Sequence, residues 1–352
     1  RTPSWRMTVS HSVTITSTGR ALPSRLIDAE AVRRMVPAAL PLGPDAGDTA
    51  WSRYWCAAHE STVDLAEEAA LQALERAGLT ATDIDLLVVA TDTPEYILPA
   101  TAAVLQERLE MRAVPAFDLT ASGDGFLPAL EVVRGYLAGA SAPQRALLVG
   151  ACTLSKYLDG HDHRTVPYIG DGAGALLLEV GQRDNDGDGH RTSAGAPVGV
   201  LGSDVRTSAR DVHTFGIFAG GSRTPVTHAV IDAGIQNRLR WTGPMPPPLP
   251  VEACADQLRA LLARFGLEPA MVQHWLWAQI GDGAVAAIME ALGEEMARVH
   301  STRSALGFTG SACTPLTLDD AVTRGLLATG DVVVLAGAGA GRDLCATVVR
   351  WG

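Results

Sequence analysis

A hydroxyl and a carboxyl flank a glycine at Ser122, Gly123 and Asp124, directly before a segment with the pattern of a buried helix. A serine can carry an acyl group when a base lies within hydrogen-bond reach, and Asp124 could be that base. Two simpler roles compete with this chemistry. The Ser122 hydroxyl can bond to nearby backbone, and an aspartate at a helix entry commonly caps the helix. The three residues therefore mark a candidate site for acyl transfer.

Two cysteines offer an alternative nucleophile. Cys152 ends a predicted buried strand, and Cys313 lies in a later loop. The sequence places no His or Lys immediately beside either residue to lower the pKa of its thiol. We therefore predict that both cysteines are small packing residues.

The pattern of helices and strands around these residues is that of a layered parallel sheet. Ser61 and Asp64 form a capping-box start, Gly78 supplies a stop, and the apolar residues between them have helical spacing. Residues 84–90 (IDLLVVA) form a short β-branched run, typical of a strand covered on both faces. Further strands are predicted at 13–16, 116–119, 146–149, 173–180, 198–201, 275–278, 332–335 and 346–350, and further helices at 126–137, 251–265 and 284–292.

This order of elements repeats along the chain. It predicts an α/β protein of two similar halves, residues 7–181 and 197–352, and suggests an internal duplication. Residues before Met7 are set aside. In the polar stretch between the halves, residues 184–189 have the spacing of the first half of an EF-hand loop, but Gly195 stands where that loop needs a glutamate. We predict a solvated connection there and no metal site.

The composition excludes several classes of protein. A net charge of −11 argues against a general binder of nucleic acid or of anionic membranes, because the field of the protein would repel polyanions. The five cysteines are scattered without metal-ligand spacing, which indicates free thiols in a reducing cytoplasm. No apolar run approaches the roughly 20 residues that cross a bilayer. We expect a cytoplasmic α/β protein.

Five motifs occur in the order and spacing of one known family. They are residues 91–95 (TDTPE) with 99–102 (PATA), 116–119 (AFDL) leading into Gly125 and Phe126, 169–175 (IGDGAGA), 201–204 (LGSD) and 337–341 (GAGAG). Through them the chain resembles the β-ketoacyl-ACP synthase III branch of the thiolase superfamily, over nearly its whole length.

The resemblance implies a fold, an assembly and a chemistry. The fold is a thiolase-like five-layered αβαβα arrangement of two halves, and the first half builds a dimer. In the family, a cysteine at the N-terminus of a buried helix takes an acyl group from CoA or a carrier protein. A His and an Asn stabilise the enolate formed when a malonyl group decarboxylates, and the cysteine's backbone amide helps to form an oxyanion hole. No cofactor beyond the acyl thioester is implied.

None of the three catalytic side chains is at its place in this chain. Matching the motifs puts Gly123 at the cysteine position, Ala278 at the His position and Phe308 at the Asn position. A glycine and two apolar side chains can neither form a thioester nor donate a hydrogen bond to an intermediate. The resemblance therefore predicts an acyl-thioester site that has lost condensation. We expect Gly123, Ala278, Phe308, Leu98 and Gly341 to line it.

Two functions follow from this prediction. The chain could be a silent condensing-enzyme homologue in fatty-acid or polyketide-type biosynthesis, as a homodimer or as the partner of a triad-bearing ketosynthase. Alternatively it could be a repurposed acyltransferase or esterase-like enzyme that uses Ser122, with Asp124 as a possible base, or that works by positioning alone. An acyl carrier protein is a possible partner in both cases. It is acidic, so its docking would require a local arginine patch.

Overall fold

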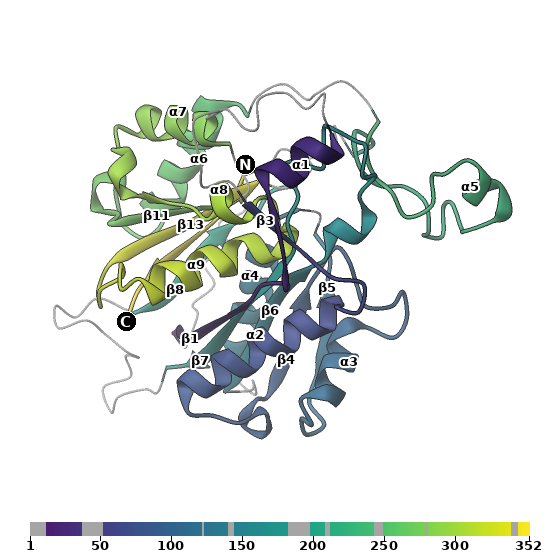
Figure 1. Ribbon diagram of the computed structural model, residues 1–352. Coiled ribbons are helices and arrows are strands. Elements are labelled where there is room, and N and C mark those ends of the chain that lie inside the picture. The colour runs from purple at the N-terminus through teal and green to yellow at the C-terminus, as the bar shows by residue number, and fades with distance from the viewer. Residues whose placement is uncertain are drawn as a thin grey trace.

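Two five-stranded sheets are stacked with helices between them and on both outer faces (Figure 1). The structure is a computed structural model that describes residues 12–36, 52–121, 123–139, 144–181, 198–207, 212–242, 249–278, 281–338 and 344–352. Ser122, Gly341 and the EF-hand-like residues 184–189 lie outside the described residues.

The two sheets have the same strand order and the same strand directions. In the first sheet the order is β1-β7-β6-β4-β5, and in the second it is β8-β14-β13-β11-β12. In each sheet the first two pairings are antiparallel and the last two are parallel. This repeat is what an internal duplication would produce. The strands are β1 (Val13–Ala21), β4 (Leu86–Ala90), β5 (Ala116–Leu119), β6 (Arg145–Cys152), β7 (Gly172–Val180), β8 (Gly199–Asp204), β11 (His274–Ala278), β12 (Val299–His300), β13 (Val332–Ala338) and β14 (Leu344–Arg350).

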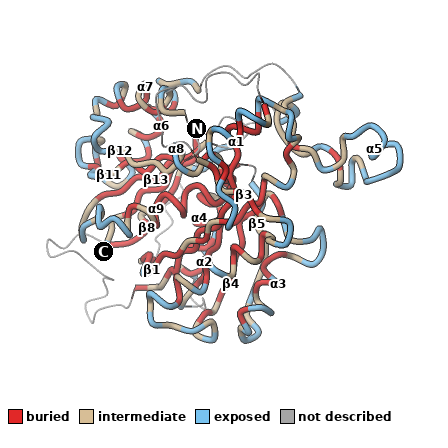
Figure 2. The backbone as a smooth tube through the Cα atoms, in the orientation of Figure 1, coloured by how far each residue is buried: buried red, intermediate tan, exposed pale blue. Residues whose placement is uncertain are grey.

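Six helices complete the layers. The first outer layer is α2 (Thr62–Ala77) with α3 (Thr101–Arg108), the middle layer is α4 (Phe126–Leu137) with α9 (Cys313–Thr323), and the second outer layer is α6 (Val251–Ala263) with α7 (Asp282–Leu292). Separate hydrophobic clusters fill the spaces under the two outer layers, and a third joins both sheets to the middle helices. Figure 2 shows that most residues of the central strands and of the middle layer are buried, whereas the edge strands β5 and β12 are only partly buried. The five-layered αβαβα prediction is confirmed.

The ends of α2 are fixed by local sequence. The Ser61 side chain accepts a hydrogen bond from the Asp64 amide, and the Asp64 carboxylate accepts one from the Ser61 amide. Gly78 ends the helix with a φ of 66°, a conformation that favours glycine. The predicted capping box and stop are therefore both present.

The buried face of α2 packs very closely on the first sheet. It is built largely from alanines, and a methyl group added to Gly19 of β1 would overlap the carbonyl oxygen of Ala69. Small residues on both sides are what allow the two backbones to approach. The buried alanines are Ala66, Ala69, Ala70 and Ala73.

Short elements lie outside the layers. Figure 1 shows α5 at the tip of an arm that projects from the body. The first half also contains a two-stranded antiparallel sheet and a short helix near its start. These elements are β2 (Arg25–Asp28), α1 (Ala29–Met35), β3 (Ser52–Trp55), β9 (Phe215–Ile217), α5 (His228–Asp232), β10 (Leu239–Trp241) and α8 (Arg303–Leu306). Among the described residues, no helix is both long and apolar enough to cross a membrane.

Candidate functional site

The candidate site lies where β4 and β5 end. These strands are parallel neighbours, so their carboxyl ends reach the same edge of the first sheet. The chain segments that follow them are joined by two hydrogen bonds: the Thr91 amide donates to the Leu119 carbonyl (3.1 Å), and the Thr120 hydroxyl donates to the Thr91 carbonyl (2.9 Å). The fold thereby holds the residue after Thr91 next to the residues before α4.

Gly123 offers only backbone at this edge. It is buried and has a φ of 89°, a conformation that side-chain-bearing residues rarely adopt. Its amide donates a hydrogen bond to Oδ2 of Asp92 at 3.0 Å. The position at which the resemblance predicts a cysteine is therefore a glycine whose amide is bonded to a carboxylate.

Asp92 is a site residue that the sequence prediction missed. It lies in the 91–95 motif used for the family resemblance, directly after a buried strand, and it is half-buried. The available signal was its place at the carboxyl end of a parallel strand, where α/β proteins bind ligands. The contact with Gly123 joins residues 31 positions apart and appears only in the fold.

The turn that carries Asp92 is held from both sides. Thr91 and Thr93 are buried, and the Thr93 amide donates to the Thr91 hydroxyl at 3.0 Å. The Thr93 hydroxyl accepts from the Thr153 amide at 2.9 Å, and the Thr93 carbonyl accepts from the Thr62 hydroxyl at 2.7 Å. Asp92 therefore has little freedom to leave the site by moving its backbone.

Asp124 is fully buried at the entry of α4. Its Oδ2 accepts a hydrogen bond from the Thr314 hydroxyl at 2.9 Å. Burial raises the pKa of Asp124 to about 7, and the charge of Asp92 adds to the rise. The Thr314 hydroxyl and the amides of Phe126 and Leu127 act in the opposite direction. α4 has no side-chain cap, and Oδ1 of Asp124 is buried without a hydrogen-bond partner among the described residues, so the predicted cap is not formed. The carboxyl holds its proton up to neutral pH.

The second sheet closes the site from the other side. Ala278 at the end of β11 is buried and pairs with Gly337 of β13. A methyl group added to Gly337 would overlap Oδ2 of Asp124, so this strand touches the Asp124 carboxyl. At the position where a His is expected, the side chain is thus only the buried methyl group of Ala278. It lies on the strand next to β13, whose Gly337 contacts Asp124.

Phe308 places an apolar ring beside the loop that precedes β7. Its amide donates to the Tyr168 carbonyl (2.7 Å), and its carbonyl accepts from the Gly170 amide (3.0 Å). The half-buried ring makes an edge-to-face contact with Phe215, with ring centroids 6.3 Å apart. This aromatic contact stands at the position where the resemblance predicts an asparagine.

The thiols of Cys152 and Cys313 are buried and unreactive, as expected of packing residues. Cys313 is buried, and its sulfur accepts hydrogen bonds from the amide and hydroxyl of Thr309 at 3.1 and 3.2 Å. Burial raises the pKa of Cys313 to about 12 and that of Cys152 to about 11. Both are neutral thiols at neutral pH, which makes them poor nucleophiles.

Leu98 lies on a surface loop between β4 and α3. It is 86% exposed and its neighbour Ile97 is 89% exposed, with Tyr96 also exposed. Such large exposed side chains side by side are typical of an interaction surface.

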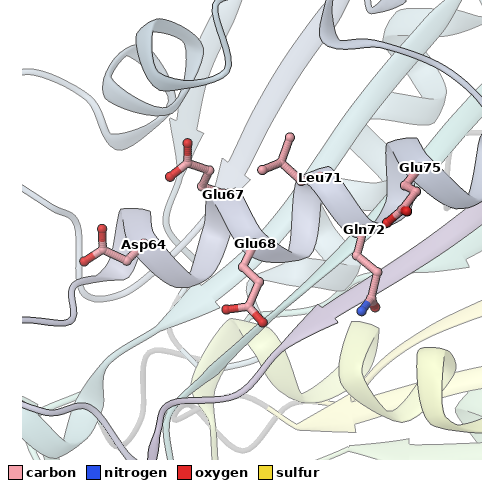
Figure 3. A pocket seen from close by; sticks show the side chains of 6 residues that line it. All are labelled: Asp64, Glu67, Glu68, Leu71, Gln72 and Glu75. Atoms are coloured by element: carbon pink, nitrogen blue, oxygen red, sulfur yellow. The ribbon is translucent and has the colours of Figure 1, made fainter.

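A hollow lies on the outer face of α2 (Figure 3). Arg108 forms ion pairs with Asp64 and Glu67 at its margin. Neither Asp92 nor Gly123 lines this hollow. Its lining is Asp64, Glu67, Glu68, Leu71, Gln72 and Glu75.

Comparisons with known proteins identify the family of the chain. Residues 117–194 match the family described as 3-Oxoacyl-[acyl-carrier-protein (ACP)] synthase III, and residues 262–351 match the description of its C terminal part. The β-ketoacyl-[acyl-carrier-protein] synthase III of Sinorhizobium medicae is 34% identical over 299 residues, which cover 85% of this chain and 87% of that protein. The acetoacetyl CoA synthase of a Streptomyces species is 31% identical over 353 residues, covering 96% and 98%.

A solved structure extends the likeness to the fold. The crystal structure of 3-oxoacyl-(acyl carrier protein) synthase III from Pseudomonas aeruginosa superposes with a TM-score of 0.79 and 27% identity, over 97% of this chain and 98% of that one. Together with the sequence matches, this shows that the chain belongs to the 3-oxoacyl-[acyl-carrier-protein] synthase III family.

Proposed function

We propose that this protein binds acyl thioesters of CoA or of a carrier protein without condensing them, as a silent or partner subunit in fatty-acid or polyketide-type biosynthesis. The observation that carries the proposal is the bare backbone of Gly123 at the head of α4. Transfer of an acyl group to the protein needs a nucleophilic side chain there, and glycine has none.

The thioester ligand is inferred from the relatives. They are named as a β-ketoacyl-[acyl-carrier-protein] synthase III and an acetoacetyl CoA synthase, and the chain spans at least 87% of each. Ala278 and Phe308 carry no hydrogen-bond donor in their side chains, so neither can stabilise an enolate. The ligand class is retained in this proposal and the condensation is lost.

A second subunit is part of the proposal. Tyr96, Ile97 and Leu98 form an exposed apolar tip, which would be covered by the first half of a partner. The partner is either a second copy of this chain or a ketosynthase that has the Cys-His-Asn triad.

The test compares this protein with an active homologue. Purified protein is incubated with acetyl-CoA and radiolabelled malonyl-CoA, and released CO₂ and the intact mass of the protein are measured. The acetoacetyl CoA synthase of Streptomyces serves as the active control, because its product is a CoA thioester. The expected result is CO₂ release at the level of buffer and no acyl adduct, with retained acetyl-CoA binding by calorimetry. Condensation by this chain alone would overturn the proposal.

A second candidate function is a repurposed acyltransferase that uses Ser122. It is favoured by the position of the Asp92 carboxylate at the amide of the next residue, Gly123, which puts a potential base near this part of the chain. Under this candidate, acyl-CoA leaves a mass adduct that is lost in Ser122→Ala. Absence of the adduct from the wild-type protein eliminates acyl transfer through Ser122.

A further inference from the structure

We infer that Asp92 is a second disabling residue of this site: its carboxylate occupies the Gly123 amide, so a thiol restored at residue 123 would still be unable to perform the family's chemistry. The inference deepens the proposed function and rests on it for the class of ligand. It assigns a role to a residue outside the three family positions.

The first argument is the occupancy of the amide. An oxyanion hole needs a backbone N–H that is free to donate to the oxygen on which charge develops. The Gly123 N–H already donates to Oδ2 of Asp92 at 3.0 Å. An incoming thioester carbonyl would have to displace a carboxylate, which forms a stronger hydrogen bond than a neutral carbonyl does.

The second argument is charge. A negative carboxylate next to a thiol disfavours the thiolate, and it also repels an oxyanion or enolate. The effect is visible at Cys152, whose pKa is raised first by burial and then by the charge of Asp92. A thiol at residue 123 would share this environment with the carboxyl of Asp124 and with the thiol of Cys313 on α9.

The third argument is rigidity. The buried hydroxyls of Thr91 and Thr93 fix the turn on either side of Asp92 through hydrogen bonds to backbone amides. A carboxylate on a mobile loop could move away when a ligand enters. This turn is bonded to the residue after β5, Thr120, and to the residue after β6, Thr153, so the backbone that carries the carboxylate is held in place.

The experiment reintroduces the thiol and then removes the carboxylate in two steps. The variants are Gly123→Cys alone, Gly123→Cys with Asp92→Asn, and Gly123→Cys with Asp92→Ala. The asparagine removes the charge but keeps an oxygen that can accept from the amide, whereas the alanine removes both. Gly123→Cys with Glu95→Gln is the matched control, because Glu95 also accepts from a backbone amide at a helix start, that of Val63 in α2.

Two readouts separate the arguments. The rate of iodoacetamide alkylation against pH gives the pKa of the introduced thiol, and the intact mass after acetyl-CoA gives acyl transfer. Asp92→Asn and Asp92→Ala are both expected to increase the alkylation rate at neutral pH about tenfold, the effect of lowering a thiol pKa by about one unit. Acyl transfer is expected only with Asp92→Ala, and Glu95→Gln is expected to change neither readout.

A further measurement leaves residue 123 unchanged, because a side chain at a φ of 89° could impair folding. In Asp92→Ala with the native glycine, hydrogen exchange of the Gly123 amide is expected to accelerate at least about tenfold, since its acceptor is gone. Unchanged exchange would overturn the inference. The inference would also be overturned if Gly123→Cys alone accepted acyl groups as fast as Gly123→Cys with Asp92→Ala. That result would leave the proposed function of the wild-type protein intact.

Discussion

The carboxyl of Asp124 lies directly against the α-carbon of Gly337, and a methyl group added to that glycine would overlap Oδ2. Asp124 precedes the middle helix α4, whereas Gly337 is on β13 of the second sheet. The contact therefore joins the two halves of the molecule at the candidate site.

Gly337→Ala should destabilise the protein by about 1–3 kcal/mol, because the added methyl group forces the buried carboxyl out of its place. Urea unfolding measures the change. Gly135→Ala in α4 is the control: no atom lies within contact of its added methyl group, so a gain of about 0.5–1 kcal/mol is expected from helix propensity. Equal effects of the two substitutions would contradict the contact.

Asp124 should make the protein less stable as the pH rises. Its folded pKa of about 7 lies above the ordinary value of 3.8, so the folded state binds a proton that the unfolded state has lost between these values. The stability that this proton contributes is complete below pH 3.8, the ordinary pKa, and is lost as the pH rises through the folded pKa of about 7. Between about pH 5 and about pH 8, Asp124→Asn should therefore gain about 2–3 kcal/mol of unfolding free energy relative to wild type. A difference that does not change with pH would show that Asp124 titrates normally.

All five cysteines should resist alkylation in the native protein. Each is buried, and burial holds the pKa values of Cys152 and Cys313 at about 11 and about 12. Iodoacetamide at mildly alkaline pH should add no label to the folded protein and five labels in denaturant, as counted by intact mass. Rapid native labelling at Cys313 would instead identify it as an accessible nucleophile.

Asp319→Ala should destabilise the protein by about 2–3 kcal/mol, because it leaves the partners of a buried carboxylate unpaired. Asp319 on α9 accepts from the Thr18 hydroxyl at 2.7 Å and from Arg76 at 2.5 Å. Chemical denaturation measures the loss. Glu30→Ala removes an exposed ion pair with Arg34 and should cost less than about 0.5 kcal/mol. A loss at Asp319 as small as this would show that its bonds contribute little.

The parts of the fold that depend on neighbouring residues could be predicted from sequence. The bounds of α4 and β5 agree with the prediction, and the capping box at Ser61 fixes the start of α2. β1 runs to Ala21, well beyond the four residues predicted, because pairing with β7 supplies partners for a polar continuation that has no strand signal of its own.

The candidate site could be predicted only where a family motif carried it. Gly123 was found through its place before Gly125 and Phe126, whereas its contact with Asp92 depends on two strands ending at the same edge. The burial of Asp124, which shifts its pKa, likewise comes from the second half of the chain, through Thr314 and Gly337. The assigned boundaries of the halves, 7–181 and 197–352, remain predictions.

The alanine face of α2 and Gly19 beneath it have a consequence for how such a protein can change during evolution. Because a methyl group at Gly19 would already overlap the backbone of α2, no larger residue fits at this contact, and the distance between α2 and the first sheet is fixed there. Exchange of a single residue after the end of a strand, as at Gly123, leaves this contact unchanged. Members of one family can in this way keep the same fold while the residues of their sites differ.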